Sequence, residues 1–538
     1  MTETLVSRLE SWCATDLPAV VDRRSSWTYA TLAARSRRIA AHLLDGAPDL
    51  GDARVAFFIP PGLDYVAVLL GIWRAGGIAV PLAIAHPPAE LAFVIEDCGA
   101  SIVISTPETA HIVASAAAVS PSPRSFFVVR DGKLKLLSRT SSTAQHARER
   151  SESAARRAMI LYTSGTTGKP KGVVTTHGNI AAQIQSLVSA WDWRAEDRTL
   201  LVLPLHHVHG IINVLGCALW SGATCETFPR FDAESVWERL SSGEISVFTA
   251  VPTIYYRLIA SWDAASEDER RRRSEGVRAI RLMMSGSAAL PLRTLERWRE
   301  ISSHVLLERY GMTEIGMALA NPLRGVRRPG FVGQPLPGVD VRLAGENGDP
   351  VPAGTPGELE IRGAGVFGEY WRRPDATREA FRDGWFRTGD VAVVEDGAYR
   401  LLGRTSIDII KSGGHKISAL EIEDVLREHP AIAECAVVGV EDDEWGQRVC
   451  VAVELRPAEQ LTMADLEPWA RARLAPYKIP REVVAVPALP RNAMGKVVKP
   501  DVAVLFQSKV SGPGEGQRAE GKGKGKGERA KGRSLPPP

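Results

Sequence analysis

The feature that most constrains the fold is a ten-residue run, Thr-Ser-Gly-Thr-Thr-Gly-Lys-Pro-Lys-Gly, at positions 163–172. It follows the apolar residues 159–162 and precedes two valines, which predicts a buried strand, a loop, and then a second strand or a helix. Glycine lets the backbone turn tightly and approach a ligand, while hydroxyl groups and lysines can bind an anion. The run is not a Walker A motif, because its Gly-Lys pair comes too early and a proline follows. On composition alone, it could be a phosphate-binding loop or an ordinary solvated loop.

Apolar segments that predict strands and a helix precede this loop. Residues 54–59 and 78–82 are predicted strands, and residues 63–73 between them form a predicted helix. Two further candidates for buried strands follow at 102–105 and 125–129. Strands that alternate with helices indicate an α/β fold in which helices cover the faces of a sheet.

Length and composition limit the class of protein. A chain of 538 residues with 44% hydrophobic content predicts a large core divided into more than one domain. The net charge is only +3, and the tail 510–538 supplies +4 of it from seven Lys or Arg and three Glu, so the folded part gives no reason to expect a nucleic-acid partner. Six scattered cysteines without a Cys-x-x-Cys pair predict reduced thiols. The acidic N-terminus and the short apolar runs argue against a signal peptide, a transit peptide or a membrane span, so we expect a soluble cytoplasmic protein.

Several short polar motifs follow the loop. Histidines 206, 207 and 209 come directly after an apolar run, but no Cys or carboxylate lies beside them and their spacing fits no zinc site. Farther on, Thr253 is expected to cap a helix on which Arg257 shares an apolar face, either as a functional cation or with its stem along the core edge.

Three more motifs could contact a nucleotide. In the segment Arg309–Glu314, an aromatic ring precedes Gly and a carboxylate follows Thr, which could form an adenine slot and a Mg²⁺ ligand together with the small residues 285–288. The carboxylate of Thr388-Gly389-Asp390 could accept hydrogen bonds from hydroxyl groups. Each motif is weak alone, and their order along the chain gives them weight.

A second domain is predicted from residue 404. It contains a basic loop at 411–416, a capping box at 418–421 that opens a helix, and a last motif at 490–496. We expect an ATP- and acyl-binding domain at 1–403, a small α+β domain at 404–509, and a disordered Gly/Lys-rich tail at 510–538.

Taken in this order, the motifs resemble those of the adenylate-forming enzymes, which include acyl-CoA synthetases, firefly luciferase and the adenylation domains of peptide synthetases. The resemblance implies a large N-terminal α/β domain of layered sheets and helices, followed by a small, mobile α+β lid that rotates between two half-reactions. It also implies ATP and Mg²⁺ as cofactors and coenzyme A as co-substrate. It gives catalytic roles to Thr163, Lys171, Glu314 and Lys496, with Glu314 as the metal ligand.

The same resemblance assigns the binding residues. Those expected to bind ATP are Thr163, Ser164, Gly165, Thr166, Thr167, Gly168, Lys169, Gly286, Ser287, Ala288, Tyr310, Gly311, Met312, Thr313, Asp390 and Arg404. Those expected to bind coenzyme A are Lys411, Gly413, Gly414 and His415. The hinge is expected at Ser406, where many members of the family have Asp or Lys.

Within the family, the chain is most similar to the malonyl-CoA synthetases, particularly the branch called acyl-CoA synthetase family member 3. Residues 251–257, 308–317 and 403–411 carry this likeness. Most relatives have a neutral residue where this chain has Arg309, and a guanidinium can bind a carboxylate bidentately. The resemblance therefore implies an acid–thiol ligase that joins malonate or methylmalonate to coenzyme A through an acyl-adenylate. The residues expected to contact the acyl substrate are His207, His209, Arg257, Arg309 and Met317.

Three other functions stay open at this point. The chain could be a ligase for another small, medium-chain or aryl acid, in which Arg257 and Arg309 are structural. It could be an adenylation module for a carrier protein, or a non-catalytic binding protein, although the retained Lys496 argues against a pure binder. One methyl group in an apolar pocket changes binding by only about 1–3 kcal/mol, so malonate and methylmalonate are not separated. We expect a monomer or weak dimer that binds neither nucleic acid nor membrane.

Overall fold

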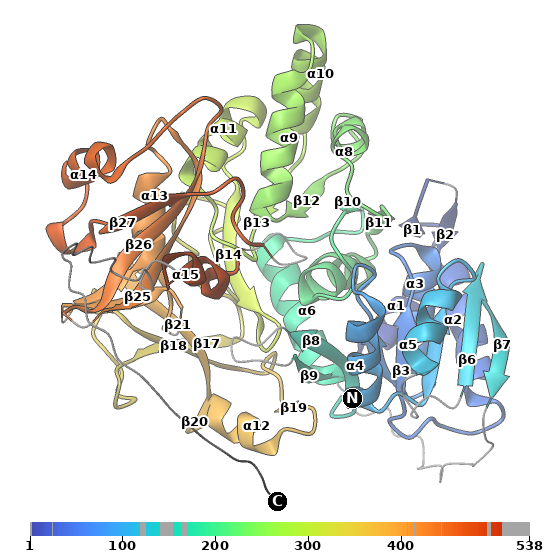
Figure 1. The fold of residues 1–538 in the computed structure, drawn as a ribbon. Helices are drawn as coiled ribbons and strands as arrows, with labels where there is room; N and C mark the ends of the chain where they lie inside the picture. Colours follow the sequence, from blue (N-terminus) through green and yellow to red (C-terminus); the bar gives the residue numbers. More distant parts are fainter. Residues whose placement is uncertain are drawn as a thin grey trace, which may run out of the picture.

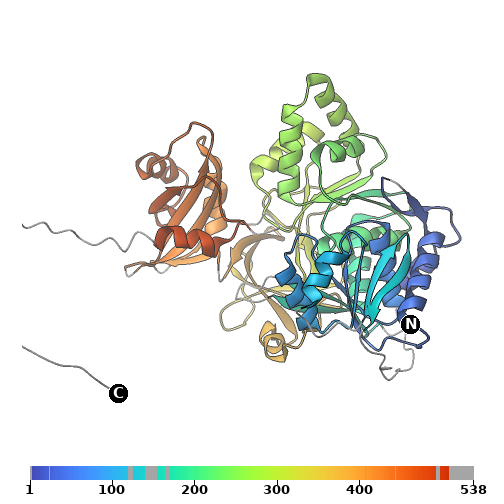
Figure 2. The same ribbon diagram turned by 45° about the vertical axis from the view of Figure 1, so that its right-hand side comes forward.

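The structure is a computed structural model that describes residues 3–23, 25–118, 125–139, 154–163, 170–405, 407–413, 415–442, 444–491 and 497–507. Three sheets and their helices form the N-terminal region, and a fourth sheet belongs to the C-terminal domain. The C-terminal domain, orange to red, lies to one side of the rest (Figures 1 and 2).

The sheet that carries the glycine-rich loop has eight strands. In spatial order they are β19 (Glu369–Tyr370), β9 (Lys171–Thr176), β8 (Arg157–Thr163), β4 (Ile78–Pro81), β3 (Arg54–Phe58), β5 (Ile102–Ser105), β6 (Ser125–Arg130) and β7 (Lys133–Arg139). The central strands are parallel and nearly fully buried, as expected where helices cover both faces. The strands predicted from hydrophobic runs are therefore confirmed.

The second sheet has nine strands. In spatial order they are β16 (Gln334–Pro335), β15 (Gly316–Ala320), β14 (Leu307–Met312), β13 (Leu282–Ser285), β12 (Val247–Ala250), β10 (Arg198–Leu201), β11 (Thr224–Thr227), β1 (Pro18–Val21) and β2 (Ser26–Thr28). Strands β10, β12, β13 and β14 are parallel, so their carboxyl ends meet at one edge. Ligands of open α/β sheets bind at this edge.

The third sheet is antiparallel and follows in the chain. It contains β17 (Val339–Ala344), β18 (Gly357–Gly363), β20 (Phe381–Arg382), β21 (Trp385–Glu395) and β22 (Ala398–Arg404). Asp396 and Gly397, both with positive φ, form the tight turn between β21 and β22. This hairpin ends at Arg404, where the C-terminal domain was expected to begin.

The C-terminal domain packs helices against a five-stranded sheet. Its strands are β23 (Ile409–Ser412), β24 (His415–Ser418), β25 (Ile432–Asp442), β26 (Gly446–Leu455) and β27 (Glu482–Ala485), and its helices are α13 (Ala419–Leu426), α14 (Met463–Arg471), α15 (Lys499–Gln507) and the short 3₁₀ turn η2 (Pro476–Lys478). Ser418 caps α13 by accepting the N–H of Glu421, as predicted. The expected capping box is half formed, because the Glu421 carboxylate pairs with Lys478 instead.

The helices of the N-terminal region cover the sheets on both sides (Figure 1). They are α1 (Leu5–Glu10), α2 (Tyr29–Leu44), α3 (Leu63–Arg74), α4 (Pro88–Cys98), α5 (Ala110–Ala118), α6 (His177–Trp191), the π-helix η1 (His209–Gly216), α7 (Cys217–Ser221), α8 (Ala233–Leu240), α9 (Pro252–Ala264), α10 (Glu267–Arg278), α11 (Leu292–Ser302) and α12 (Pro374–Ala380). Helix α9 begins one residue before the predicted cap Thr253, because Pro252 takes its first position.

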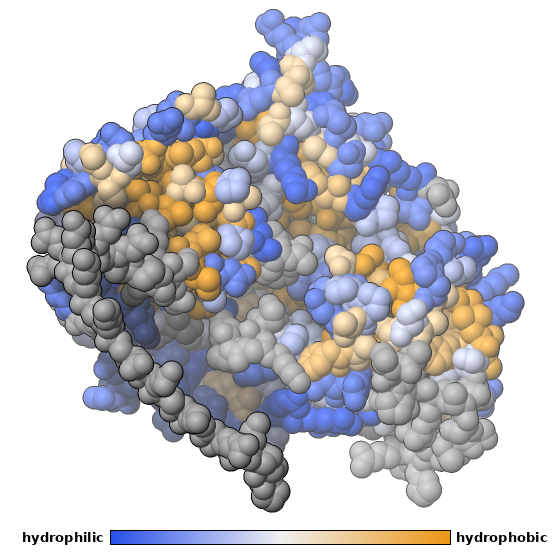
Figure 3. Space-filling model, in the orientation of Figure 1, coloured by the Kyte–Doolittle hydropathy of each residue, from blue (hydrophilic) through white to orange (hydrophobic). Residues whose placement is uncertain are grey.

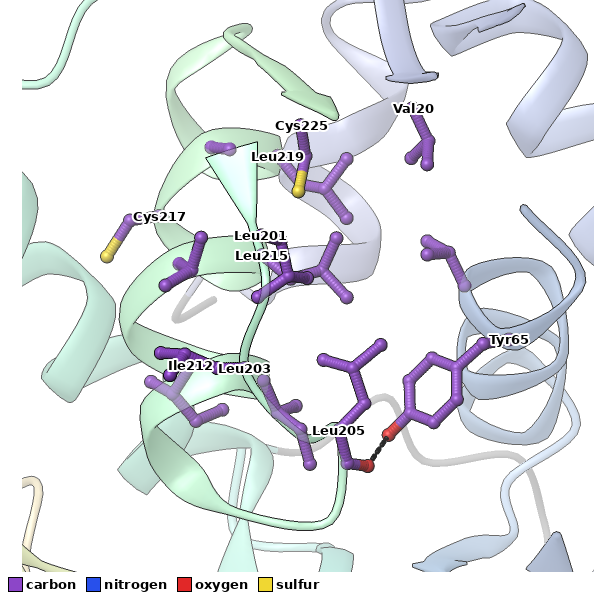
Figure 4. Packing of buried hydrophobic residues seen from close by; sticks show 14 of the residues in the cluster. Val20, Tyr65, Leu201, Leu203, Leu205, Ile212, Leu215, Cys217, Leu219 and Cys225 are labelled. Carbon is purple, nitrogen blue, oxygen red and sulfur yellow. Dashed lines mark hydrogen bonds between the residues drawn. The ribbon is translucent and has the colours of Figure 1, made fainter. Parts of the chain in front are cut away.

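The main core joins the first two sheets through η1 and α3. In Figure 4, Tyr65 of α3 lies beside the aliphatic residues of β10 and η1, and its hydroxyl donates to the carbonyl of Leu205. By contrast, the projecting α10 is covered by hydrophilic residues in Figure 3. Across the described part of the chain, none of the helices combines the length and the apolar character needed to cross a membrane.

Candidate active site

The glycine-rich run forms the end of a β-hairpin. Thr163 closes β8 and pairs with Lys171, the first residue of β9. Of the two predicted arrangements, strand–loop–strand is therefore the observed one. The remaining loop residues, Ser164, Gly165, Thr166, Thr167, Gly168 and Lys169, lie outside the described residues.

Lys171 and Glu314 meet at Tyr370. The Lys171 ammonium lies 5.3 Å from the centre of the Tyr370 ring, and the Tyr370 hydroxyl donates to Glu314 Oε1 at 2.9 Å. The Glu314 carboxyl is buried, and this burial raises its pKa. A cation beside it would offset that cost.

This arrangement fits Mg²⁺ held jointly with a nucleotide. Within the described ranges, no group of three or more His, Cys, Asp and Glu side chains could hold a metal ion without other ligands. Mg²⁺ usually binds to one or two carboxylates plus substrate phosphates. Glu314 is a suitable single protein ligand of this kind, and a bound Mg²⁺ would neutralise charge on the phosphates.

A second group of residues surrounds Asp390. Its two carboxylate oxygens accept a hydrogen bond from the Tyr310 hydroxyl and one from Arg404 Nε, the latter at 3.1 Å. Tyr310 comes from β14, whereas Asp390 and Arg404 face each other across the β21–β22 hairpin. The structure thus brings together three residues predicted to bind ATP. Burial raises the pKa of Asp390, and Arg404 opposes this rise.

The turn after β13 lies beside Arg309 and has a strained backbone. Ser287 has φ +71°, a left-handed conformation that is uncommon for residues other than glycine. A Cβ at Gly286 would lie 3.0 Å from Arg309 Nη1. Small residues at 286 and 287 therefore allow the backbone to pass close to Arg309, while Ala288 is exposed beyond them.

Arg309 is a buried cation on β14. It is 3% exposed, and Nη2 donates to Thr249 Oγ1 at 2.7 Å, while Nη1 contacts Met317 Sδ at 3.2 Å. Its guanidinium lies over the Trp191 ring, 5.5 Å from the centre. Burial lowers the pKa of Arg309 to about 10, so the group stays charged at neutral pH.

Arg309 also fixes the protonation of His209. Nη2 contacts His209 Nε2, and because arginine only donates, Nε2 must accept and the ring proton resides on Nδ1. Nδ1 is then the donor to Ser287 Oγ at 3.0 Å. His209, Ser287, Thr249 and Arg309 therefore form one connected polar cluster at the carboxyl ends of the parallel strands.

No carboxylate within the described residues forms an ion pair with Arg309, and its Nε lacks a hydrogen-bond partner among them. A buried charge without a counter-ion is costly, which is why such groups are usually paired. The cluster is therefore suited to receive an anion.

The other predicted acyl-site residues differ in position. The His207 ring lies beside the His206 ring, tilted by 52° with the ring centres 4.1 Å apart, just before η1. The sulfur of Met317 contacts Arg309. The expectation that Arg257 shares the apolar face of its helix is wrong, because its side chain is exposed on α9 while the neighbouring Leu258 is buried. Arg309 is buried in contact with His209, whereas Arg257 is exposed. The structure therefore does not bring the two arginines together.

The residues predicted to bind coenzyme A lie in the C-terminal domain. Lys411 and His415 belong to the β23–β24 hairpin, and the His415 ring stacks on Tyr477 at 4.3 Å. Gly413 has φ +55° and donates its N–H to the Trp445 carbonyl. The predicted residues Gly414, Ser406 and Lys496 lie outside the described residues.

Sequence reasoning missed three residues of these clusters. Thr249, Trp191 and Tyr370 come from β12, α6 and β19, and none stands within a recognisable motif. Their roles depend on which strands and helices become neighbours. Only the place of Thr249 near the end of an apolar strand gave a weak signal, since polar residues at strand ends often face a ligand.

Comparison with known proteins agrees with this fold. Residues 10–371 match the AMP-binding enzyme family, and residues 421–496 match the AMP-binding enzyme C-terminal domain. The chain therefore belongs to the AMP-binding, adenylate-forming enzyme family.

Particular relatives narrow this class. A malonate–CoA ligase named ACSF3, mitochondrial, from Xenopus laevis is 44% identical over 91% of this chain and 89% of its own, and the protein of that name from Homo sapiens is 45% identical over 90% and 89%. The crystal structure of ATP-bound MatB from Rhodopseudomonas palustris has a TM-score of 0.83 at 32% identity and covers 95% of this chain and 100% of its own.

These relatives contradict the expected cytoplasmic location. Four vertebrate relatives that match most of the chain are named mitochondrial. The expectation depended on the acidic residues of the N-terminal segment. Such residues describe that segment alone and do not determine where an enzyme of this kind works.

Proposed function

We propose that this chain joins malonate to coenzyme A in two steps. One malonate carboxylate attacks the α-phosphorus of ATP, which forms malonyl-adenylate and releases pyrophosphate. The thiolate of coenzyme A then attacks the acyl carbon and displaces AMP. The relatives named malonate–CoA ligase support this reaction for the whole chain.

The observation that carries the choice of substrate is the unpaired, buried guanidinium of Arg309. A monocarboxylic acid uses its only carboxylate in the reaction and leaves this charge without a partner. A dicarboxylic acid has a second carboxylate, which can accept hydrogen bonds from Arg309 and from neighbouring hydroxyl groups such as that of Ser287. Methylmalonate is a second candidate with the same charges.

The remaining residues are proposed to act on the nucleotide. Asp390 and Tyr310 would hold the ribose and the adenine, and Lys171, Thr163 and the loop between them would bind the phosphates. Glu314 would hold Mg²⁺. Lys496 would stabilise the charge that develops as pyrophosphate leaves. Rotation of the C-terminal domain at Ser406 would then withdraw Lys496. The same rotation would bring Lys411, Gly413, Gly414 and His415 to the coenzyme A channel.

The test is pyrophosphate release with ATP, Mg²⁺ and coenzyme A for malonate, methylmalonate, succinate, acetate and butyrate. We expect malonate or methylmalonate to be preferred, with malonyl-CoA or its methyl homologue identified by mass. Arg309→Ala should lower kcat/KM for the preferred acid about 100-fold, because a charge-assisted hydrogen bond of roughly 3 kcal/mol is lost. Thr249→Val should lower it less, since the guanidinium remains.

Two results would contradict the proposal. Equal turnover of butyrate, insensitive to Arg309→Ala, would indicate a ligase for monocarboxylic acids. ATP binding without pyrophosphate release would indicate a binding protein. Arg257→Ala, tested in parallel, measures whether the exposed arginine adds to the recognition of the second carboxylate.

A further inference from the structure

Lys499 is a largely buried lysine to which the proposed reaction gives no role. It is the first residue of α15, and its side chain is only 10% exposed. The ammonium lies 2.5 Å from Asp408 Oδ1 and 2.8 Å from Glu423 Oε1. Burial lowers the pKa of Lys499, but the charges of Glu423 and Asp408 together outweigh it, so the pKa is raised and the group is charged.

Glu423 anchors this lysine to the core of the C-terminal domain. It belongs to α13 and is 4% exposed on its side chain. The same oxygen that pairs with Lys499 accepts the N–H of Val437 in β25 at 2.8 Å. Its position is therefore fixed by the domain's own sheet, and Lys499 is held at a defined place relative to α13 and β25.

Asp408 connects Lys499 to the nucleotide side of the expected hinge. One carboxylate oxygen pairs with Lys499, and the other accepts the backbone N–H of Arg404 at 3.1 Å. The backbone of Asp408 also donates to the Arg404 carbonyl at 2.8 Å, and its own carbonyl accepts the N–H of Ala419. One carboxylate thus joins the residues on either side of position 406.

Position 403, where β22 approaches Asp408, has room only for a glycine. Gly403 has φ +117°, and a Cβ there would lie 2.3 Å from the Cβ of Asp408. The close approach brings the Asp408 carboxylate against the backbone of the β22 end. Arg404, whose backbone N–H donates to Asp408, also donates to Asp390 through its side chain.

A continuous chain of polar contacts therefore runs from the ribose site to α15. It passes from Asp390 through Arg404 and Asp408 to Lys499. In the sequence, Lys499 stands three positions after Lys496, so whatever fixes the start of α15 also limits where the preceding segment can reach. By contrast, the surface ion pair Arg471–Glu467 joins two residues of the same helix, α14.

We propose that Lys499 and Asp408 are a pair of positioning residues for adenylate formation. The pair holds the start of α15 in register with the nucleotide-side end of the hinge, so that Lys496 is delivered to the departing pyrophosphate. This inference rests on the proposed function. Thioester formation, from which Lys496 is withdrawn, does not depend on the pair.

The test separates the two half-reactions. Adenylate formation is followed by malonate-dependent exchange of pyrophosphate into ATP. Thioester formation is followed by mixing coenzyme A with adenylate already formed on excess enzyme in the presence of pyrophosphatase. Asp408→Asn and Lys499→Met should each lower the exchange rate at least 10-fold, with less than a threefold change in the KM for ATP and in the thioester rate.

Asp408→Asn is the decisive variant. In it, Lys499 keeps Glu423 as its partner and no buried carboxylate is left unpaired. Lys499→Arg should restore part of the exchange lost in Lys499→Met. The double variant Asp408→Asn/Lys499→Met should exchange no more slowly than Lys499→Met, since the two residues act as a unit.

Lys478→Met is the matched control. Lys478 is a half-buried lysine of the same domain that pairs with Glu421 of the same helix, α13, but does not contact Asp408. Its exchange rate should equal that of the wild type. Melting temperatures of all variants show whether a loss of rate only follows a loss of stability.

The outcomes are distinct. A wild type that does not exchange pyrophosphate refutes the proposed function and this inference with it. An active wild type, with both half-reactions reduced equally in Asp408→Asn or with neither reduced, refutes the inference alone.

Discussion

At the scale of single residues, Glu308 makes the stability of the fold depend on pH. It stands beside Arg309 on β14, is 7% exposed, and accepts the backbone N–H of Gly330 at 3.0 Å. Burial raises the pKa of its carboxyl from 4.5 to about 8. Below about pH 4.5, the group is protonated in the folded and the unfolded chain and has no effect. Between 4.5 and 8, only the unfolded chain releases the proton, so the free energy of unfolding falls as the pH rises, and above 8 the penalty is constant.

We therefore predict that Glu308→Gln removes a penalty that grows with pH. The variant should gain melting temperature relative to the wild type at pH 8 but not at pH 5, because the amide cannot ionise. Thermal unfolding at several pH values measures this. Glu379→Gln on the exposed face of α12 is the control and should follow the wild type. A parallel pH dependence in Glu308→Gln would show that the carboxyl ionises freely in the native state.

Residues that stand within motifs could be predicted from the sequence, and residues that join a site through topology could not. Tyr310 and Asp390 were assigned from their order along the chain, and the structure brings them into contact. Thr249 lies 60 positions before its partner Arg309 and on another strand. Nothing in its local sequence distinguishes it from other polar residues at strand ends.

At the scale of elements, the β14–β15 hairpin is the most tightly constrained part of the site. Its register shifts between Tyr310 and Gly311, directly beside the tyrosine that contacts Asp390. A Cβ at Gly311 would lie 2.0 Å from the Gly316 carbonyl oxygen. The oxygen belongs to the backbone and the position of a Cβ is fixed by the backbone, so the contact cannot be relieved by a side-chain rotation.

We predict that Gly311→Ala destabilises the protein by about 1–3 kcal/mol, the usual cost of overpacking. Thermal or urea unfolding gives the value. Gly368→Ala is the matched control, because a Cβ there would meet nothing within 4 Å. If both variants unfold alike, the hairpin can shift more freely than its close contacts indicate.

Hydrophobic patterns predicted elements well and their internal hydrogen bonding poorly. Strands β3, β4, β5, β6 and β8 of the first sheet follow directly from apolar runs. The π-helix after His207 was not predicted, because a wider turn of helix has almost the same apolar periodicity as an α-helix over eight residues. This π-helix begins at His209, which contacts Arg309. The contact therefore involves a segment whose type of helix the apolar pattern does not reveal.

At the scale of the whole molecule, motif order predicted two domains but not the arrangement of their sheets. Strands β1 and β2 from the N-terminus pair beside β11 at one edge of the nine-stranded sheet. Such long-range pairing depends on which hydrophobic faces fit together, and a single sequence contains little of this information. Some of the hydrophobic clusters, in contrast, belong to the C-terminal part of the chain alone. Two clusters of buried residues consist entirely of residues between 410 and 506.

This division leads to a prediction for the C-terminal domain. A fragment of residues 404–509 should fold alone, because its helices bury their apolar faces against its own sheet and little of its core comes from outside. Circular dichroism should show cooperative thermal unfolding, and amide NMR signals should be well dispersed. Val451→Asp, which places a charge at a fully buried position, should abolish both features. The complementary fragment 1–403 should still bind ATP, since Tyr310, Glu314 and Asp390 all lie within it, but should not exchange pyrophosphate without Lys496. An unfolded 404–509 fragment would mean that contacts with β22, such as that of Ser418 with the Leu402 carbonyl, are needed for the domain to fold.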